Sequence, residues 1–142
     1  MKRDASALWQ GGLKNGNGRI STESGALTEA RYGFTSRFKT KAGTNPEELV
    51  AAAHASCFAM ALSGQLEAAQ MTAKSIAVKA TVSLEKLKAG WTVTEIHLAV
   101  TAKIPEATSA KFMAVADKAK AGCPMSRLLG AAAKITMKAR LA

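Results

Sequence analysis

The longest uncharged stretch of the sequence, from Leu49 to Leu66, constrains the possible folds more than any other feature. The segment before it, Thr44–Glu48, supplies a capping residue, a proline for the first helical position and two acids, which favours a helix start. The stretch is close to the minimum length of a membrane span. It is, however, rich in alanine and contains polar and small residues, namely His54, Ser56, Ser63, Gly64 and Gln65. Because the segment is apolar almost all round, we predict a helix from Pro46 to about Ala69, buried on several sides and not in a membrane.

Strand patterns and helix patterns are segregated along the rest of the chain. Asn15–Gly18 is a strong turn signal between two short strands. Period-two alternation predicts a strand over Tyr32–Phe38 that carries Arg37 on the face opposite two phenylalanines. The later segments predict a hairpin over Ser75–Leu84 and Trp91–Ile104, helices over Thr108–Lys120 and Met125–Gly130, and a strand over Ile135–Ala139. This order predicts a single α+β domain over residues 1–142.

The formal charge of +10 raises the question of a polyanionic partner. The basic residues are spread from Lys2 to Arg140 and never occur in runs longer than two. Nucleic-acid-binding proteins instead carry clustered basic stripes, often with interleaved aromatic residues. We interpret the charge as a solvated surface and expect no nucleic-acid partner, with polyanion binding as the alternative.

The two cysteines indicate redox or metal chemistry. The amino terminus, Met1–Asp4, is not followed by the apolar core of a signal peptide. We therefore expect a cytoplasmic protein, and cysteine pairs in that reducing compartment are seldom structural. A Cys₂His₂ zinc site of His54, Cys57, His97 and Cys123 is one alternative, but only one of its pairs is close in sequence.

Cys57 lies well inside the predicted long helix, where it is either an inert core residue or a reactive thiol. Reactivity requires a lowered thiol pKa. The helix dipole acts only within the first turn, so a cation must come from elsewhere. Arg37 is a candidate for this cation. His54, three residues before Cys57, is either a satisfied core histidine or a catalytic one.

Cys123 has a different setting, between Gly122 and Pro124. The proline suits the first position of a helix, so Cys123 is predicted at a helix N-terminus. Backbone N–H groups and the helix dipole favour a thiolate there. A thiol of low pKa leaves readily in disulfide exchange, which suits a resolving cysteine. The alternative is an incidental cysteine in a helix cap.

Four segments resemble the OsmC/Ohr family. Gly43–Leu62, GTNPEELVAAAHASCFAMAL, resembles its cysteine helix, and Ala119–Arg127, AKAGCPMSR, resembles its second cysteine motif, where valine usually replaces Met125. Ser21–Gly25 and Tyr32–Phe38 are similar to the OsmC branch. The resemblance covers nearly the whole chain in the expected order.

The resemblance implies a fold, an activity and partners. The fold is an intertwined homodimer with antiparallel sheets around the long cysteine-bearing helix, and it needs no metal and no bound cofactor. The activity is reduction of organic hydroperoxides in stress defence, with Cys57 as the attacking thiolate and Cys123 as its resolving partner. Electrons come from an external dithiol, either a lipoyl-type or a small thiol. The alternative is an OsmC-like binding protein with vestigial thiols and a basic polyanion-binding surface.

The family also supports its reactive cysteine with an arginine and a glutamate. Glu47 matches the glutamate by its position in the motif. The arginine matches Arg37 in the OsmC branch, whereas the Ohr branch places it near Arg19, and we favour Arg37. An apolar pocket for the peroxide is also expected, with Phe34, Phe58 and Met60 as possible lining.

The spacing of Glu47 and Cys57 bears on the homodimer. Ten residues along a helix correspond to an axial separation of about 15 Å, which a glutamate side chain cannot cover. A two-fold axis near Ala52 would bring Glu47 of one chain opposite Cys57 of the other. The alternative is that Ala51–Ala53 merely packs the helix against its own sheet.

Overall fold

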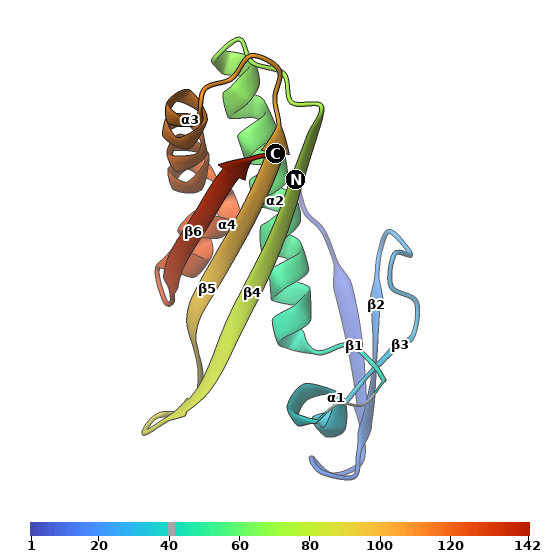
Figure 1. Cartoon of the computed structure of the whole chain (residues 1–142). Coiled ribbons are helices and arrows are strands. Elements are labelled where there is room, and N and C mark those ends of the chain that lie inside the picture. The colour runs from blue at the N-terminus through green and yellow to red at the C-terminus, as the bar shows by residue number, and fades with distance from the viewer. Residues whose placement is uncertain (40–41) are drawn as a thin grey trace. The chain divides into compact units, whose positions relative to one another are not determined.

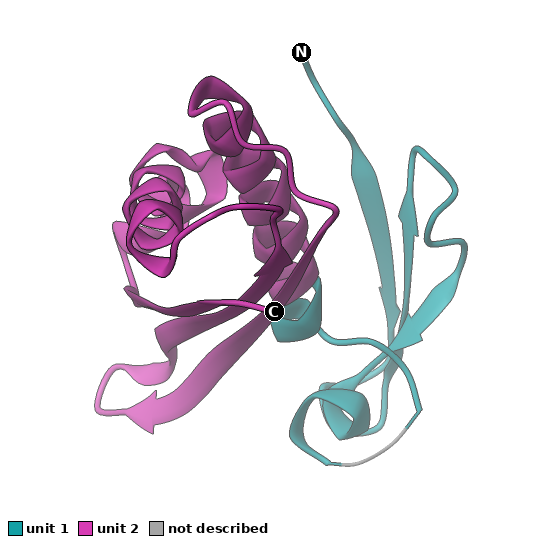
Figure 2. Cartoon of the chain, turned by 45° about the horizontal axis from the view of Figure 1, so that its top comes forward, with its two compact units in different colours: residues 1–49 teal, residues 50–142 magenta. Residues whose placement is uncertain are grey.

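The computed structural model describes residues 1–39 and 42–142. They form two compact units, Met1–Leu49 and Val50–Ala142, which are coloured separately in Figure 2. The expectation of a single domain over residues 1–142 stays a prediction.

The first unit contains a three-stranded antiparallel sheet of order β1-β2-β3. Its strands are β1 (Ala5–Gln10), β2 (Asn17–Thr22) and β3 (Ala30–Tyr32). Residues 11–16 join β1 to β2, in a register that pairs Gln10 with Asn17. The turn predicted at Asn15–Gly18 is therefore confirmed only in part, because Asn17 and Gly18 already belong to β2. A Cβ atom at Gly18 would collide with the ring of Tyr32, so a side chain at this position would displace that ring.

The predicted strand over Tyr32–Phe38 is wrong. β3 ends at Tyr32, and the short helix α1 (Phe34–Phe38) follows. Phe34 and Phe38 are four residues apart, a spacing that puts them on one face of a strand and of a helix alike. Their rings pack at 4.8 Å between centroids. Ser36 completes the helix, because its Oγ accepts a hydrogen bond from the N–H of Gly33 (2.9 Å). Arg37 therefore projects from a helix.

The second unit contains a three-stranded sheet of order β4-β5-β6 (Figure 1). Its strands are β4 (Ser75–Leu87), β5 (Gly90–Lys103) and β6 (Lys134–Leu141). β4 and β5 form the predicted hairpin, with Leu87 paired to Gly90. The β4–β5 pair is antiparallel as expected, whereas β6 runs parallel to β5 and departs from the expected antiparallel sheets. The reason is the crossover through α3 (Ser109–Gly122) and α4 (Pro124–Gly130), since such connections return the chain in the same direction.

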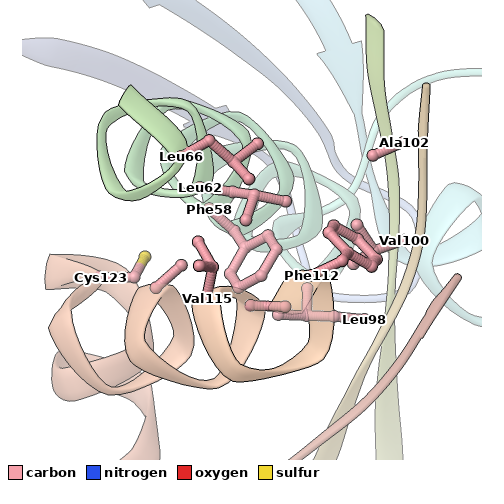
Figure 3. Close-up of a cluster of buried hydrophobic side chains, with 11 residues drawn as sticks. Phe58, Leu62, Leu66, Leu98, Val100, Ala102, Phe112, Val115 and Cys123 are labelled. Carbon is pink, nitrogen blue, oxygen red and sulfur yellow. The ribbon is translucent and has the colours of Figure 1, made fainter. Parts of the chain in front are cut away.

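The core of the second unit lies between this sheet and two helices, α3 and α2 (Pro46–Ala68) (Figure 1). Side chains from α2, α3 and β5 meet there, as Figure 3 shows. Burying a phenylalanine or leucine side chain contributes about 1.5–3 kcal/mol, so these contacts fix α2 on the sheet. The fully buried side chains include Phe58, Leu62, Leu66, Leu98, Phe112 and Cys123.

Helix α2 is buried on one stripe and not on several sides as predicted. The buried residues of α2 are His54, Phe58, Leu62 and Leu66, which repeat every four positions. On another part of the helix, the side chain of Met60 is 76% exposed. The helix is long and apolar enough to cross a membrane by length and composition. Its role in the core of the second unit supports the interpretation as a core helix.

Candidate active site

The two cysteines lie together in the second unit. The Sγ atoms of Cys57 and Cys123 are 3.4 Å apart, and both residues are free thiols. Cys123 is fully buried and Cys57 is partly exposed. A disulfide bond is about 2.05 Å long, so a small approach of the two sulfur atoms is enough to form it.

Two helices position these thiols. Cys57 lies next to Phe58, whose burial in the core fixes the rotation of α2. Cys123 ends α3 and is the N-cap of α4, with Pro124 at the start of that helix. The predicted location of Cys123 at a helix N-terminus is therefore confirmed. The N–H of Cys123 donates to the carbonyl of Ala119 (2.8 Å), which ties the cap to the last turn of α3.

The surroundings of Cys57 raise the pKa of its thiol above the ordinary value. Burial is the main cause, because it disfavours the charged thiolate. A hydrogen bond from the backbone N–H of Met125 acts in the opposite direction and lowers the pKa, while Cys123 raises it further. The lowered pKa expected for a reactive cysteine is therefore not produced by these neighbours. Reactivity of Cys57 requires an additional positive charge.

Arg37 and Glu47 form an ion pair in the first unit. Nε of Arg37 donates to both carboxylate oxygens of Glu47 at 3.1 Å, and Nη2 donates to Oε1 at 2.6 Å. Fork-shaped pairing of this kind fixes the orientation of the guanidinium. The guanidinium also lies 5.3 Å from the centroid of the Phe38 ring. The carboxylate is more buried than the arginine, with side-chain exposures of 14% and 36%.

Arg19 has a different neighbourhood. It lies on β2 opposite Arg31 of β3, and its Nη1 is 3.4 Å from the carbonyl oxygen of Glu29. The structure therefore brings Glu47 to Arg37. This geometry favours Arg37 over Arg19 as the supporting cation, although the role itself stays a prediction.

A polar contact near the cysteines was not anticipated from the sequence. Nε2 of His54 lies 2.8 Å from Oγ of Ser126, and both side chains are buried. Nδ1 of His54 is buried and has no hydrogen-bond partner in the part of the chain that the structure describes. Burial lowers the pKa of His54, which favours the neutral imidazole. The signal in the sequence is spacing: His54 precedes Cys57 by three residues, and Ser126 follows Cys123 by three.

The lowered pKa of His54 predicts a loss of stability in acid. The unfolded chain takes up this proton near pH 6.5, whereas the folded chain resists it. The contribution of neutral His54 to the free energy of unfolding is therefore fully present above about pH 6.5. It is lost as the pH falls through the lower, folded-state pKa, by about 1.4 kcal/mol for each unit between the unfolded and folded pKa values. Urea unfolding at pH 8 and pH 5.5 measures the effect. His54→Gln should show a smaller drop between the two pH values, and an equal drop would contradict the assignment.

An apolar hollow lies beside Arg37 within the first unit. It encloses about 290 Å³ and its lining includes Trp9, Phe34, Arg37 and Phe38. Phe34 therefore lines a hollow as expected. Phe58 does not, because it is fully buried in the core of the second unit. Met60 is largely exposed, and it is not part of the lining of the hollow beside Arg37.

The zinc alternative lacks a geometric basis in residues 1–39 and 42–142. Within them, no three His, Cys, Asp or Glu side chains gather as metal ligands would. His97 instead places Nδ1 2.8 Å from Oγ1 of Thr136, on the neighbouring strand.

Comparison with known proteins places the chain in a family. Residues 39–138 match the model of the OsmC-like protein family. The chain belongs to this family. It is 47% identical over 131 residues to peroxiredoxin OsmC of Escherichia coli K12, with 92% of each chain covered. The same identity and coverage hold for peroxiredoxin OsmC of Shigella flexneri. The predicted family is thus confirmed, and the name of these OsmC relatives agrees with the predicted enzyme class, a cysteine-based peroxidase.

Solved structures confirm the predicted α+β, OsmC-like fold class. The organic hydroperoxide resistance protein OhrB of Bacillus subtilis superposes with a TM-score of 0.76 at 22% identity, covering 96% of this chain and 98% of OhrB. An OsmC-like protein of Mycoplasma pneumoniae gives a TM-score of 0.79 at 16% identity, with coverages of 99% and 97%. At these identities the likeness concerns the fold alone.

Proposed function

We propose that this protein reduces organic hydroperoxides to alcohols, with Cys57 as the nucleophile and Cys123 as the resolving thiol. The observation that carries the proposal is the 3.4 Å separation of the two sulfur atoms. Two free thiols at this distance suit reversible disulfide formation. Membership of a family that includes proteins named peroxiredoxin supports the direction of the chemistry.

The first step oxidises Cys57. Its thiolate attacks one oxygen of the peroxide bond, the O–O bond breaks, and the alkoxide leaves and takes up a proton to become the alcohol. Cys57 retains the attacked oxygen, with its hydrogen, as a sulfenic acid. The transition state gains negative charge on the departing oxygen, so a fixed cation at this point accelerates the step.

The second step forms the disulfide. The Cys123 sulfur attacks the sulfenic sulfur of Cys57, an S–S bond forms, and the oxygen leaves as water. An external dithiol then reduces the disulfide by two exchange steps and becomes a disulfide itself. In this scheme the protein carries no metal and no bound cofactor. We propose a lipoyl-type or small dithiol as reductant in the cytoplasm.

Arg37 supplies the positive charge that Cys57 needs, and Glu47 orients it. The need arises because burial raises the pKa of Cys57. The bidentate pair holds the guanidinium in one orientation, which prepares it for a peroxide or a thiolate. Glu47 and Cys57 lie ten residues apart on α2, about 15 Å along its axis. We therefore propose that the functional unit is a homodimer in which Arg37 and Glu47 serve Cys57 of the partner chain.

The hollow beside Arg37 accounts for a preference for organic over inorganic peroxides. It is lined by aromatic side chains, among them Trp9, Phe34 and Phe38. Apolar groups gain about 25 cal/mol for each Å² of surface removed from water, so an alkyl or aryl group binds here better than a hydroxyl. Hydrogen peroxide has no such group and gains nothing from this hollow.

Arg37→Ala should raise the pKa of the Cys57 thiol by one unit or more. Each unit corresponds to about 1.4 kcal/mol of lost thiolate stabilisation and a tenfold lower thiolate fraction at neutral pH. Thiolate absorbance near 240 nm, followed against pH, measures the shift. Arg19→Ala is the matched control and should titrate as the unaltered protein does. A shift in Arg19→Ala with none in Arg37→Ala would transfer the role to Arg19.

Steady-state turnover tests the proposed function directly. The purified protein is mixed with a dithiol and either cumene hydroperoxide or hydrogen peroxide, and peroxide loss is followed. We expect catalytic consumption of both, with a higher kcat/KM for the organic substrate. Absence of consumption would favour the alternative, an OsmC-like binding protein with vestigial thiols and a basic surface.

A further inference from the structure

Two contacts join α2 to the first turn of α4. Cys57 of α2 meets Cys123, the N-cap of α4, and His54 of α2 meets Ser126. Each helix contributes residues three positions apart, so the contacts lie about one turn from each other on both helices. Whatever fixes His54 against Ser126 therefore also fixes the distance between the two sulfur atoms.

The His54–Ser126 contact is costly for a purely structural element. His54 is fully buried, and its Nδ1 has no hydrogen-bond partner among residues 1–39 and 42–142. A buried polar atom without a partner is destabilising, and an apolar pair of similar shape would avoid that cost. Buried polar groups that persist despite such a cost restrict neighbouring elements to one arrangement, and the arrangement here is that of the cysteines.

Helix α4 is short, and Ser126 is the buried polar residue of its first turn, next to Met125, which packs partly buried against the core. The helix spans seven residues, Pro124–Gly130. The same turn carries the backbone N–H of Met125, which donates to the sulfur of Cys57. A rotation or shift of this turn would therefore move Cys123 and Met125 together.

We propose that His54 and Ser126 are positioning residues that hold the first turn of α4 so that Cys123 reaches Cys57 after oxidation. The inference rests on the proposed function and deepens it. Without the hydrogen bond, the turn samples positions in which the sulfur atoms are farther apart. The Cys57 sulfenic acid then lives longer, and a second peroxide oxidises it to the sulfinic acid before Cys123 attacks.

The test compares variants that lose the hydrogen bond with variants that keep it. Ser126→Ala removes the hydroxyl and Ser126→Thr retains it. His54→Leu removes the ring nitrogen, and His54→Gln retains a polar group at a similar distance from the backbone. Thermal unfolding of each variant identifies simple loss of stability.

The first readout is the fate of oxidised Cys57. The sulfenic acid is formed with one equivalent of cumene hydroperoxide and its conversion to disulfide is followed by rapid quenching and mass spectrometry. We expect conversion to slow by roughly ten- to a hundredfold in Ser126→Ala and His54→Leu, since a displacement of about 1 Å can cost this much. The sulfinic product should increase, and Ser126→Thr and His54→Gln should recover most of the rate.

A second readout does not depend on peroxide chemistry. An aromatic disulfide reacts first with Cys57, the more exposed thiol, and releases one coloured thiolate. Attack by Cys123 on the mixed disulfide releases the second. If the wild-type protein fails to reduce peroxide, this assay still measures the approach of Cys123. If the second coloured thiolate is released as fast in Ser126→Ala as in the wild type, the positioning role is overturned, whatever the melting temperature of the variant.

Discussion

Cys57→Ser should reduce hydroperoxide consumption to the rate of the uncatalysed reaction. A serine hydroxyl is far less acidic and less nucleophilic than a thiol, so no oxygen can be taken from the peroxide. The comparison is made with cumene hydroperoxide and excess dithiol. Full multiple-turnover activity in this variant would exclude Cys57 as the nucleophile.

Cys123→Ser should behave differently from Cys57→Ser. The first oxidation remains fast, because Cys57 is intact, but the sulfenic acid has no neighbouring thiol to attack it. Mass spectrometry should show one peroxide oxygen on Cys57 after one equivalent and the irreversible sulfinic acid after repeated additions. Activity that survives many additions of peroxide in this variant would contradict a resolving role for Cys123.

Mixing Glu47→Ala and Cys57→Ser homodimers should restore activity that neither possesses alone. If Arg37 and Glu47 act across a homodimer, the heterodimer contains one complete site, with Cys57 of one chain and Glu47 of the other. Random exchange makes half of the dimers mixed, each with one of two sites, so roughly a quarter of the wild-type activity should return. Steady-state turnover after verified subunit exchange measures it.

The matched control places both substitutions on one chain and mixes it with the wild type. In a heterodimer with shared sites, one site pairs the wild-type Cys57 with Glu47→Ala and the other pairs Cys57→Ser with the wild-type Glu47. Neither site is complete, so mixing should lower the activity below that of the wild-type homodimers present before exchange. If each chain builds its own site, the same mixing leaves activity unchanged and the first mixture stays inactive. The two mixtures thus give opposite results under the two arrangements.

Local chemistry explains which parts of the structure could be predicted from the sequence. Pro46 and the acids after it mark the start of α2, and Pro124 marks the start of α4 with Cys123 as its cap. These signals act within a few residues and do not depend on the rest of the fold. The β4–β5 hairpin could be predicted from the sequence for the same reason.

The predictions failed where contacts between distant parts of the chain determine the local structure. Phe34 and Phe38 fit a strand or a helix equally, and the choice depends on Ser36, whose Oγ also lies 2.8 Å from the carbonyl oxygen of Thr44. The parallel direction of β6 depends on the crossover through two helices. The contact of His54 with Ser126 joins residues 72 positions apart. The spacing of each residue from its cysteine indicates this contact only once α2 and α4 are known to meet at the two cysteines.

The central claim is that Cys57 and Cys123 of one chain are oxidised from two free thiols to one disulfide during peroxide reduction. The direct measurement is the intact mass and thiol count of the reduced protein after one equivalent of cumene hydroperoxide without reductant. We predict loss of both free thiols, a mass lower by two hydrogens, and a digest that contains one peptide pair linked through Cys57 and Cys123 of the same chain. An unchanged thiol count with the peroxide intact, or a disulfide that links two chains, would contradict it.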